Sequence, residues 1–153
     1  MKELKVILPV HVLPAAYTCD GENKSPPLEV HGVDNTISRS LAMIVNDPDA
    51  PGGHGFIHWI IWNMELVSII PENIPKDPVV TFPISAVQGA NSAGKTGYRG
   101  PCPPSGSTHR YEFKVYGIDT FLDIPPGSEK EVLVRAMQGH VVQFGETNAQ
   151  YGR

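Results

Sequence analysis

The amino-acid sequence predicts an all-β fold built from many short strands. Fifteen glycines and fifteen prolines occur among the 153 residues, and only 18% of the residues are charged. A composition this rich in turn-forming residues favours short strands over long helices. Several apolar runs are also bounded by turn residues, as strands are. We therefore expect one domain spanning 1–153, large enough to bury about two thirds of its unfolded surface.

The N-terminal part of the chain predicts two short strands. From Leu4 to Val10 apolar residues alternate with others, an imperfect period of two that suits an edge strand containing Pro9. Pro9 also interrupts the apolar run well before the length that a signal peptide needs, so we interpret this segment as a strand. A loop dense in turn residues follows, and Leu28 and Val30 mark the next short strand.

Two strongly apolar runs predict the centre of a sheet. The run at 41–45 is continuous, which is typical of a strand buried on both faces, and it leads into Asp47. After a turn, the run at 56–63 is rich in aromatic and β-branched residues and predicts a second central strand. His58 lies near its start. The sequence thus places an acid and a histidine at the ends of two core strands.

The second half of the chain predicts two further strands of unequal quality. The segment 79–86 is the weaker, because Pro83 lies inside it and cannot donate to a strand ladder. The segment 111–118 alternates cleanly between apolar and polar residues, as a strand with one buried face does.

One helix is predicted near the C-terminus. Ser128 and Glu131 have the spacing of a capping box, and apolar residues then recur at helical intervals up to Val141. We expect the helix to end between 139 and 142. The polar segment 145–153 is expected to fold back over the body or to fray.

The segment 100–111, reading GPCPPSGSTHRY, predicts one wall of a small polar pocket. Its prolines fix φ and remove backbone N–H groups, while Gly100 has no Cβ and allows a ligand to approach closely. His109 and Tyr111 lie two residues apart, so in a strand they project from the same face. We expect a rigid loop that leads into a strand with a polar mouth.

Asp47 and Asp49 flank a proline, and turn capping is the simplest role for at least one of them. Asp47 is the better functional candidate because it continues the buried strand. A lone histidine beside a tryptophan is more often a core residue than a ligand group. A carboxylate that accepts an imidazole N–H, however, orients the ring and favours its cation. With His58 and His109, Asp47 therefore predicts an anion receptor built from the donor types that phosphate oxygens need.

Net charge and motif content argue against several classes of function. A formal charge of −4 disfavours nucleic-acid and anionic-membrane partners, since these require a basic face. His54 and His58 have an HxxxH spacing, but glycines beside them argue against a helix and no HExxH glutamate is present, so we expect no metal and no cofactor. Cys102 has no adjacent base and Ser105 lacks a nucleophile elbow, so we expect no enzyme.

The two cysteines, Cys19 and Cys102, are too few for a disulfide framework and fit no metal-binding spacing. A single bridge between them stays open at this point. No window approaches the length of a transmembrane helix, so we expect no membrane insertion and a cytoplasmic protein.

Five motifs occur in order along nearly the whole chain: YTCDGENKSPPL at 17–28, LAMIVNDPDAP at 41–51, HW at 58–59, GYRGPCPPSGSTHRYEF at 97–113 and GH at 139–140. Together they resemble the phosphatidylethanolamine-binding protein family, known also for Raf kinase inhibitor protein, and its bacterial and archaeal branch most of all. The resemblance implies a Greek-key β-sandwich of two antiparallel sheets with a few short peripheral helices. It also implies a pocket for phosphate-like anions.

Carried over by motif, the resemblance implies a ligand-binding set of Asp47, His58, Gly100, Pro103, Pro104, His109 and Tyr111. Further lining residues are expected at Phe56, Tyr98, Cys102 and Tyr151. Many members have tryptophan where this chain has Phe56, which keeps an aromatic wall but removes an indole donor.

The expected function is a non-enzymatic binding protein for a small anion, either phosphate or a phospholipid headgroup. The alternative is an inhibitor of a serine protease or a regulator of a kinase, acting through the proline-rich loop at 87–108. A hydrolase using the Asp/His cluster is a third hypothesis, which needs a nucleophile or metal. Resemblance to prokaryotic members is also compatible with a homodimer.

Overall fold

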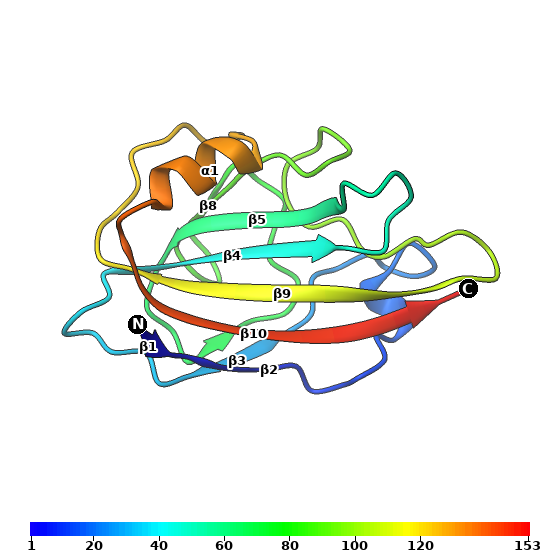
Figure 1. Cartoon of the computed structure of the whole chain (residues 1–153), viewed down its shortest axis with the longest axis horizontal. Helices are drawn as coiled ribbons and strands as arrows, with labels where there is room; N and C mark the ends of the chain where they lie inside the picture. Colours follow the sequence, from blue (N-terminus) through cyan, green and yellow to red (C-terminus); the bar gives the residue numbers. More distant parts are fainter.

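The computed structural model describes all 153 residues and confirms the all-β prediction (Figure 1). The elements in chain order are β1 (Lys2–Glu3), β2 (Lys5–Ile7), the 3-10 turn η1 (Ala15–Tyr17), β3 (Leu28–His31), β4 (Ser40–Asp47), β5 (Phe56–Met64), β6 (Ile69–Ile70), β7 (Val79–Val80), β8 (Ala86–Gln88), β9 (Thr108–Ile118), α1 (Lys130–Met137) and β10 (Val141–Gly152). They form one domain-sized unit with strands in two sheets.

The larger sheet has the order β1-β10-β9-β4-β5-β8-β7, and the smaller has the order β2-β3-β6. All pairings between these strands are antiparallel except the two-residue contact of β1 with β10, which is parallel. The expectation of two antiparallel sheets is confirmed, with one short parallel pair added at the edge of the larger sheet. Within the N-terminal run predicted as a strand, only β2 forms, in the smaller sheet, while β1 precedes the run and joins the larger sheet.

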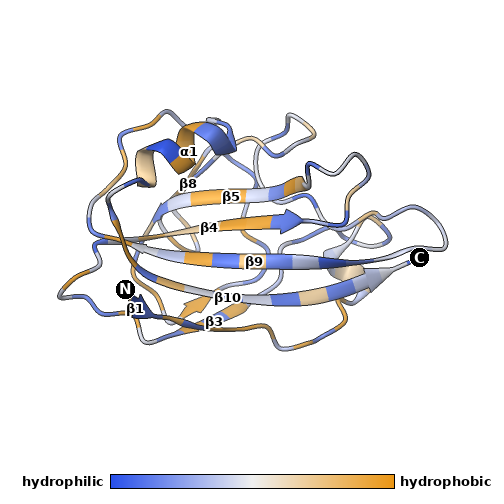
Figure 2. Ribbon diagram, viewed as in Figure 1, coloured by the Kyte–Doolittle hydropathy of each residue, from blue (hydrophilic) through white to orange (hydrophobic).

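The two faces of the larger sheet are buried against different partners. One face packs on the smaller sheet in a core of 22 buried residues, to which Met43 and Val45 of β4 contribute. The other face carries a cluster of eight buried residues, in which Ala42 and Ile44 of β4 meet Leu133 of α1. Strand β4 is thus buried on both faces, as its continuous apolar run predicts, and Figure 2 shows hydrophobic stretches along β4 and β5.

The C-terminal segment is the largest departure from expectation. Instead of fraying, it forms the 12-residue strand β10, which pairs with β9 along its whole length. On its other side, the Leu4 and Leu13 N–H groups donate to the carbonyls of Phe144 and Gln150. Gly145 permits this approach, because a Cβ there would collide with the Leu4 carbonyl. Long-range backbone pairing therefore overrides the polar composition of the segment.

The helix and the segment around Pro83 also differ from their predicted bounds. Helix α1 ends at Met137, before the predicted 139–142, and its N-cap is Glu129. Ser128 caps nothing, because its hydroxyl donates to the Pro125 carbonyl. The predicted strand at 79–86 is two short strands, β7 and β8, joined by a turn that contains the cis peptide before Pro83.

Cys19 and Cys102 form a disulfide, which settles the alternative that the sequence left open. Disulfides persist in oxidising compartments, and also inside some hyperthermophiles, so a cytoplasmic location stays a prediction. No helix of the structure is both long and apolar enough to cross a bilayer.

Removing the disulfide is expected to destabilise the fold, because it closes a loop between residues 83 positions apart. A double Cys19→Ser/Cys102→Ser variant should lose about 2–4 kcal/mol of unfolding free energy in urea titrations. Reductant serves as the control, since it should destabilise the native sequence but leave the double variant unchanged. Equal midpoints for oxidised native protein and double variant would contradict the prediction.

Candidate functional site

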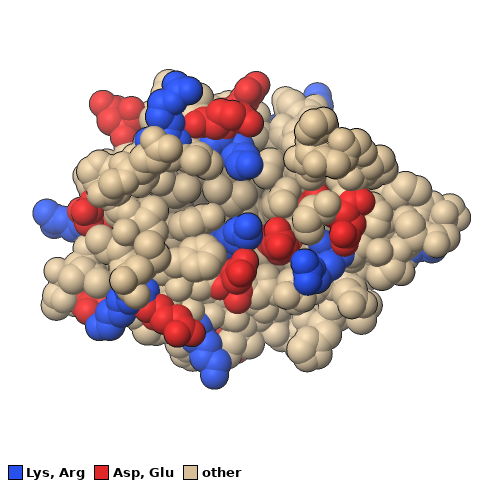
Figure 3. Space-filling view, in the orientation of Figure 1, with Lys and Arg blue, Asp and Glu red and all other residues tan.

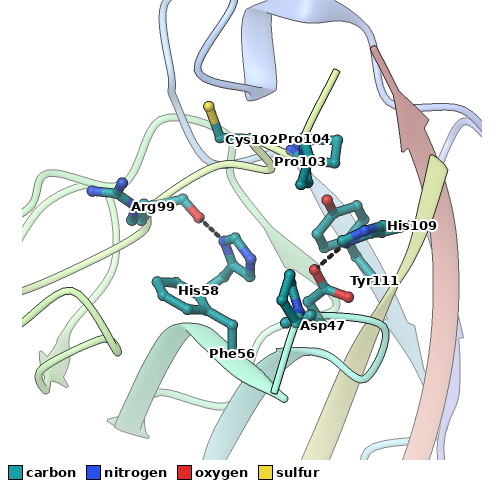
Figure 4. A pocket seen from close by; sticks show the side chains of 11 residues that line it. Asp47, Phe56, His58, Arg99, Cys102, Pro103, Pro104, His109 and Tyr111 are labelled. Atoms are coloured by element: carbon teal, nitrogen blue, oxygen red, sulfur yellow. Dashed lines mark hydrogen bonds and ion pairs between the residues drawn. The ribbon is translucent and has the colours of Figure 1, made fainter. Parts of the chain in front are cut away.

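A cavity of about 140 Å³ opens where β4 ends and where β5 and β9 begin (Figure 4). Its lining residues are Asp47, Ala50, Pro51, Phe56, His58, Arg99, Cys102, Pro103, Pro104, His109 and Tyr111. This volume exceeds the roughly 30 Å³ share of one water several-fold, so it can hold a phosphate-sized group.

Strand register brings the polar residues of the cavity together. Asp47 pairs with Phe56 across β4 and β5, while Val45 pairs with Phe113 across β4 and β9. The three strands are neighbours in the sheet, so the end of β4 and the starts of β5 and β9 lie side by side at one end of the sheet. His109 and Tyr111 are both buried and the residue between them is exposed, as the predicted alternation in β9 requires.

Asp47 orients His109, and both side chains are largely buried. The His109 Nδ1–H donates to Asp47 Oδ2 over 2.7 Å. The second carboxylate oxygen, Asp47 Oδ1, accepts the Asp49 N–H over 2.9 Å. Asp49 in turn accepts the Arg110 N–H through Oδ2. Because Nδ1 of His109 is used, Nε2 is the ring nitrogen left for a ligand. Asp47 therefore combines turn capping with histidine orientation.

His58 is held by the backbone of the neighbouring loop. Its Nδ1–H donates to the Arg99 carbonyl over 2.6 Å, and the Arg99 N–H donates back to the His58 carbonyl over 2.9 Å. Burial lowers the pKa of His58 from its ordinary value of 6.5, although the bond to the Arg99 carbonyl acts in the opposite direction. His58 is therefore neutral at neutral pH with a free Nε2 lone pair. The carboxylate expected to orient a histidine pairs with His109, so His58 has a neutral acceptor instead.

The Tyr111 hydroxyl is a buried donor with no partner. Tyr111 is 1% exposed, yet its hydroxyl makes no hydrogen bond in the protein. Its ring meets His58 edge-on, with 5.3 Å between the ring centroids. Burial raises the pKa of Tyr111, so the group stays protonated and can donate. Because a buried unpaired hydroxyl costs about 1–3 kcal/mol, this one calls for an acceptor in the cavity.

Three residues predicted to face the cavity lie elsewhere. The Gly100 N–H donates to Asn23 Oδ1 over 2.7 Å and is not available to a ligand. The Tyr98 hydroxyl donates to the Tyr17 carbonyl over 2.7 Å, and its ring packs on Trp59. The Tyr151 hydroxyl donates to the Asp20 carboxylate. These hydrogen bonds hold loops against one another, and none of the three residues lines the cavity. Only glycine fits at position 100, because a Cβ there would collide with the Tyr17 carbonyl.

Three lining residues were missed in the sequence, namely Ala50, Pro51 and Arg99. Ala50 and Pro51 follow Asp49 in the same turn, and that proximity was the available signal. Arg99 acts on His58 through its backbone, which residue type does not reveal. Cys102 lines the cavity as predicted, but Figure 4 shows its sulfur directed away from the cavity.

Comparison with known proteins identifies the family of this chain. The family model described as phosphatidylethanolamine-binding protein matches residues 5–152. This chain belongs to the phosphatidylethanolamine-binding protein family. A UPF0098 protein of Pyrococcus horikoshii is 49% identical to it over 142 residues, which are 92% of this chain and 71% of that protein. A UPF0098 protein of Methanothermobacter thermautotrophicus is 50% identical over 92% of this chain and 91% of its own length.

Solved structures of family members have the same fold. A phosphatidylethanolamine-binding protein homologue of Chlamydia trachomatis superposes with a TM-score of 0.87 at 34% identity, covering 100% of this chain and 99% of that one. Escherichia coli YbcL, described as a member of the mammalian family, superposes with a TM-score of 0.86 at 29% identity, covering 98% of both chains. The two-sheet fold predicted for this family member is thus confirmed.

The lowered pKa of His58 predicts a pH dependence of stability. A histidine with a depressed pKa in the folded state is charged more readily in the unfolded chain. Its contribution to stability is therefore full above pH 6.5 and decreases as the pH falls below that value. An NMR titration of ligand-free protein should place the His58 midpoint below 6.5.

A His58→Gln variant provides the control for this pH dependence, because it removes the titrating group. Its unfolding free energy should fall less between pH 7 and pH 5 than that of the native sequence. A His58 midpoint above the ordinary value, or identical pH profiles, would contradict the assignment.

Proposed function

We propose that this family member is a non-enzymatic binding protein whose cavity takes a small phosphate-like anion. The observation that carries the proposal is the Tyr111 hydroxyl, a buried donor that has no acceptor in the protein and belongs to a residue lining the cavity. His58 and His109 line the same cavity. The Nδ1 of each ring is bonded to a protein acceptor, which leaves each Nε2 free. Free phosphate and the phosphate of a lipid headgroup share the chemistry that this site would recognise.

The cavity supports binding coupled to proton uptake. Tyr111 donates to the anion at all pH values near neutrality. His58 is neutral without ligand, so its Nε2 lone pair would repel a fully ionised oxygen. An anion would favour the charged form of the ring, so binding raises the pKa of His58 and takes up a proton. Phe56 and Pro103 shield these contacts on their apolar sides, which strengthens them.

The chemistry of the cavity favours binding over catalysis. The Cys102 thiol is consumed by the disulfide, and Ser105 does not line the cavity. No group of three or more His, Cys, Asp or Glu side chains is arranged to hold a metal ion. Assays of phosphomonoester hydrolysis with and without divalent metals test the hydrolase alternative directly. Turnover that disappears in His58→Ala would overturn the non-enzymatic proposal.

The proposal does not need an extended charged surface. Acidic and basic side chains are interspersed on the face drawn in Figure 3, and that face carries no continuous basic area. Inhibition of a protease or regulation of a kinase through the 87–108 loop, and a homodimer, stay predictions. Within that loop, residues 92–95 are its longest continuously exposed stretch.

Tyr111→Phe separates ligand binding from stability. Removing an unpaired hydroxyl should leave the unfolding free energy unchanged or slightly higher, yet weaken phosphate binding about tenfold or more by calorimetry. Tyr116→Phe is the matched control, because Tyr116 lies on the same strand with its ring against Phe144, outside the cavity. Unchanged phosphate affinity in Tyr111→Phe would remove the main support for the proposal.

His109→Ala is expected to weaken phosphate binding by about 10- to 100-fold, because it removes a charge-assisted donor. His140→Ala provides the control, since His140 makes a similar 2.8 Å bond to Asp119 at the surface. Native affinity should also increase from pH 8 to pH 6, and proton uptake should appear as a buffer-dependent enthalpy. Equal effects of the two histidine variants would contradict the proposal.

A further inference from the structure

We infer that the cavity selects an oxyanion that carries an acidic hydrogen, because His58 presents a hydrogen-bond acceptor to the ligand. The ligand class is hydrogenphosphate, or another tetrahedral oxyanion with an acidic hydroxyl group, rather than sulfate or a phosphodiester. This inference rests on the proposed anion-binding function and narrows its ligand. The ionised oxygens of the ligand accept from donors in the cavity, and its hydroxyl group donates to His58.

The hydrogen of the neutral His58 ring is fixed on Nδ1. This nitrogen lies 2.6 Å from the Arg99 carbonyl oxygen, and a carbonyl can only accept, so Nδ1 carries the hydrogen. The Arg99 N–H donates back to the His58 carbonyl, which holds the ring and the loop in this arrangement. Nε2 therefore carries a lone pair. Figure 4 shows it directed toward the space between His58 and the Asp47–His109 pair.

The surroundings of His58 keep its ring neutral. The residue is only 5% exposed, and burial is the largest influence on its pKa, which it lowers. The Arg99 carbonyl and the Asp47 charge act in the opposite direction, while the Arg99 and His109 charges lower the pKa further. The Tyr111 ring packs edge-on against His58 and is uncharged, because burial raises its pKa. Nε2 of His58 is therefore an acceptor at neutral pH.

The other polar groups of the cavity are donors. The Tyr111 hydroxyl is buried and has no partner in the protein. His109 lies across from His58 in Figure 4, and its Nδ1–H donates to Asp47. A carboxylate partner favours the charged form of an imidazole, in which Nε2 also carries a hydrogen. The cavity thus combines donors with one acceptor, which matches an oxyanion that has both ionised oxygens and one hydroxyl group.

Hydrogenphosphate and sulfate differ in the one feature that this arrangement detects. Both are tetrahedral, and at pH 8 both carry two negative charges, but only hydrogenphosphate has a hydrogen. Hydrogenphosphate can donate to Nε2 of His58, whereas sulfate places an ionised oxygen against a lone pair unless the ring first takes up a proton from solvent. A phosphodiester, such as the phosphate of a lipid headgroup, lacks the hydrogen as well. The cavity therefore favours free phosphate over either ion.

The test compares inorganic phosphate, sulfate and dimethyl phosphate by calorimetry at constant ionic strength. At pH 8 the native protein should bind phosphate about tenfold or more tightly than sulfate or dimethyl phosphate. Sulfate binding should also take up more protons, which appears as a stronger dependence of the enthalpy on the buffer. At pH 5 a larger fraction of His58 is charged, so the preference for phosphate over sulfate should decrease.

His58→Gln should bring the ratio of phosphate to sulfate affinity near unity at pH 8, because an amide can present either a donor or an acceptor. His109→Gln is the matched control, since it should weaken both ions in parallel and keep the ratio.

The outcomes separate this inference from the proposed function. Phosphate binding with equal sulfate affinity at pH 8, or with a preference retained in His58→Gln, would overturn the inference alone. Dimethyl phosphate that binds as tightly as phosphate would also overturn it and would assign the cavity to diesters. Failure of the native protein to bind any of the three ions would overturn the proposed function and, with it, the inference.

Discussion

The burial of β4 on both faces is the constraint on which the site depends. Its odd-numbered apolar residues pack toward the smaller sheet, and Ala42 and Ile44 pack toward α1. A shift of register by one residue would exchange the two sets, so packing on both sides fixes the register of β4 against β5 and β9. The position of Asp47 at the end of β4, beside His109, follows from that register.

The cavity is preorganised by contacts that leave the ligand-facing atoms unused. The Nδ1–H of each histidine donates to a protein acceptor, which is a carboxylate for His109 and a backbone carbonyl for His58. The difference matters electrostatically, because a carboxylate stabilises an imidazolium more strongly than a neutral carbonyl does. Burial of His58 against a neutral acceptor therefore yields a site whose charge depends on what occupies it. Rigid placement of these rings reduces the entropy cost of binding.

The wall of the cavity is held by loops distant in sequence. The disulfide ties Cys102 to Cys19, and Asn23 binds the Gly100 N–H from the same N-terminal loop. Arg153 adds a bond from its guanidinium to the Pro103 carbonyl. Prolines stiffen this wall, but its distance from the strands is set by the contacts with the N-terminal loop. The same contacts leave the Arg99 side chain directed away from the cavity.

The sequence by itself determined the all-β class, the doubly buried β4, the alternating β9 and the meeting of Asp47, His58, His109 and Tyr111 at one cavity. These features depend on local periodicity and on the order of the family's motifs, and both can be recognised from the residue types alone. Tertiary structure alone decided that the polar C-terminal segment is strand β10, because an unpaired edge of β9 was available to it. Tertiary structure also decided that the Gly100 N–H donates to Asn23, that His58 donates to the Arg99 carbonyl and that the two cysteines form a disulfide. Those outcomes depend on which backbone groups and loops meet in space, and residue type does not encode the partner of a backbone group.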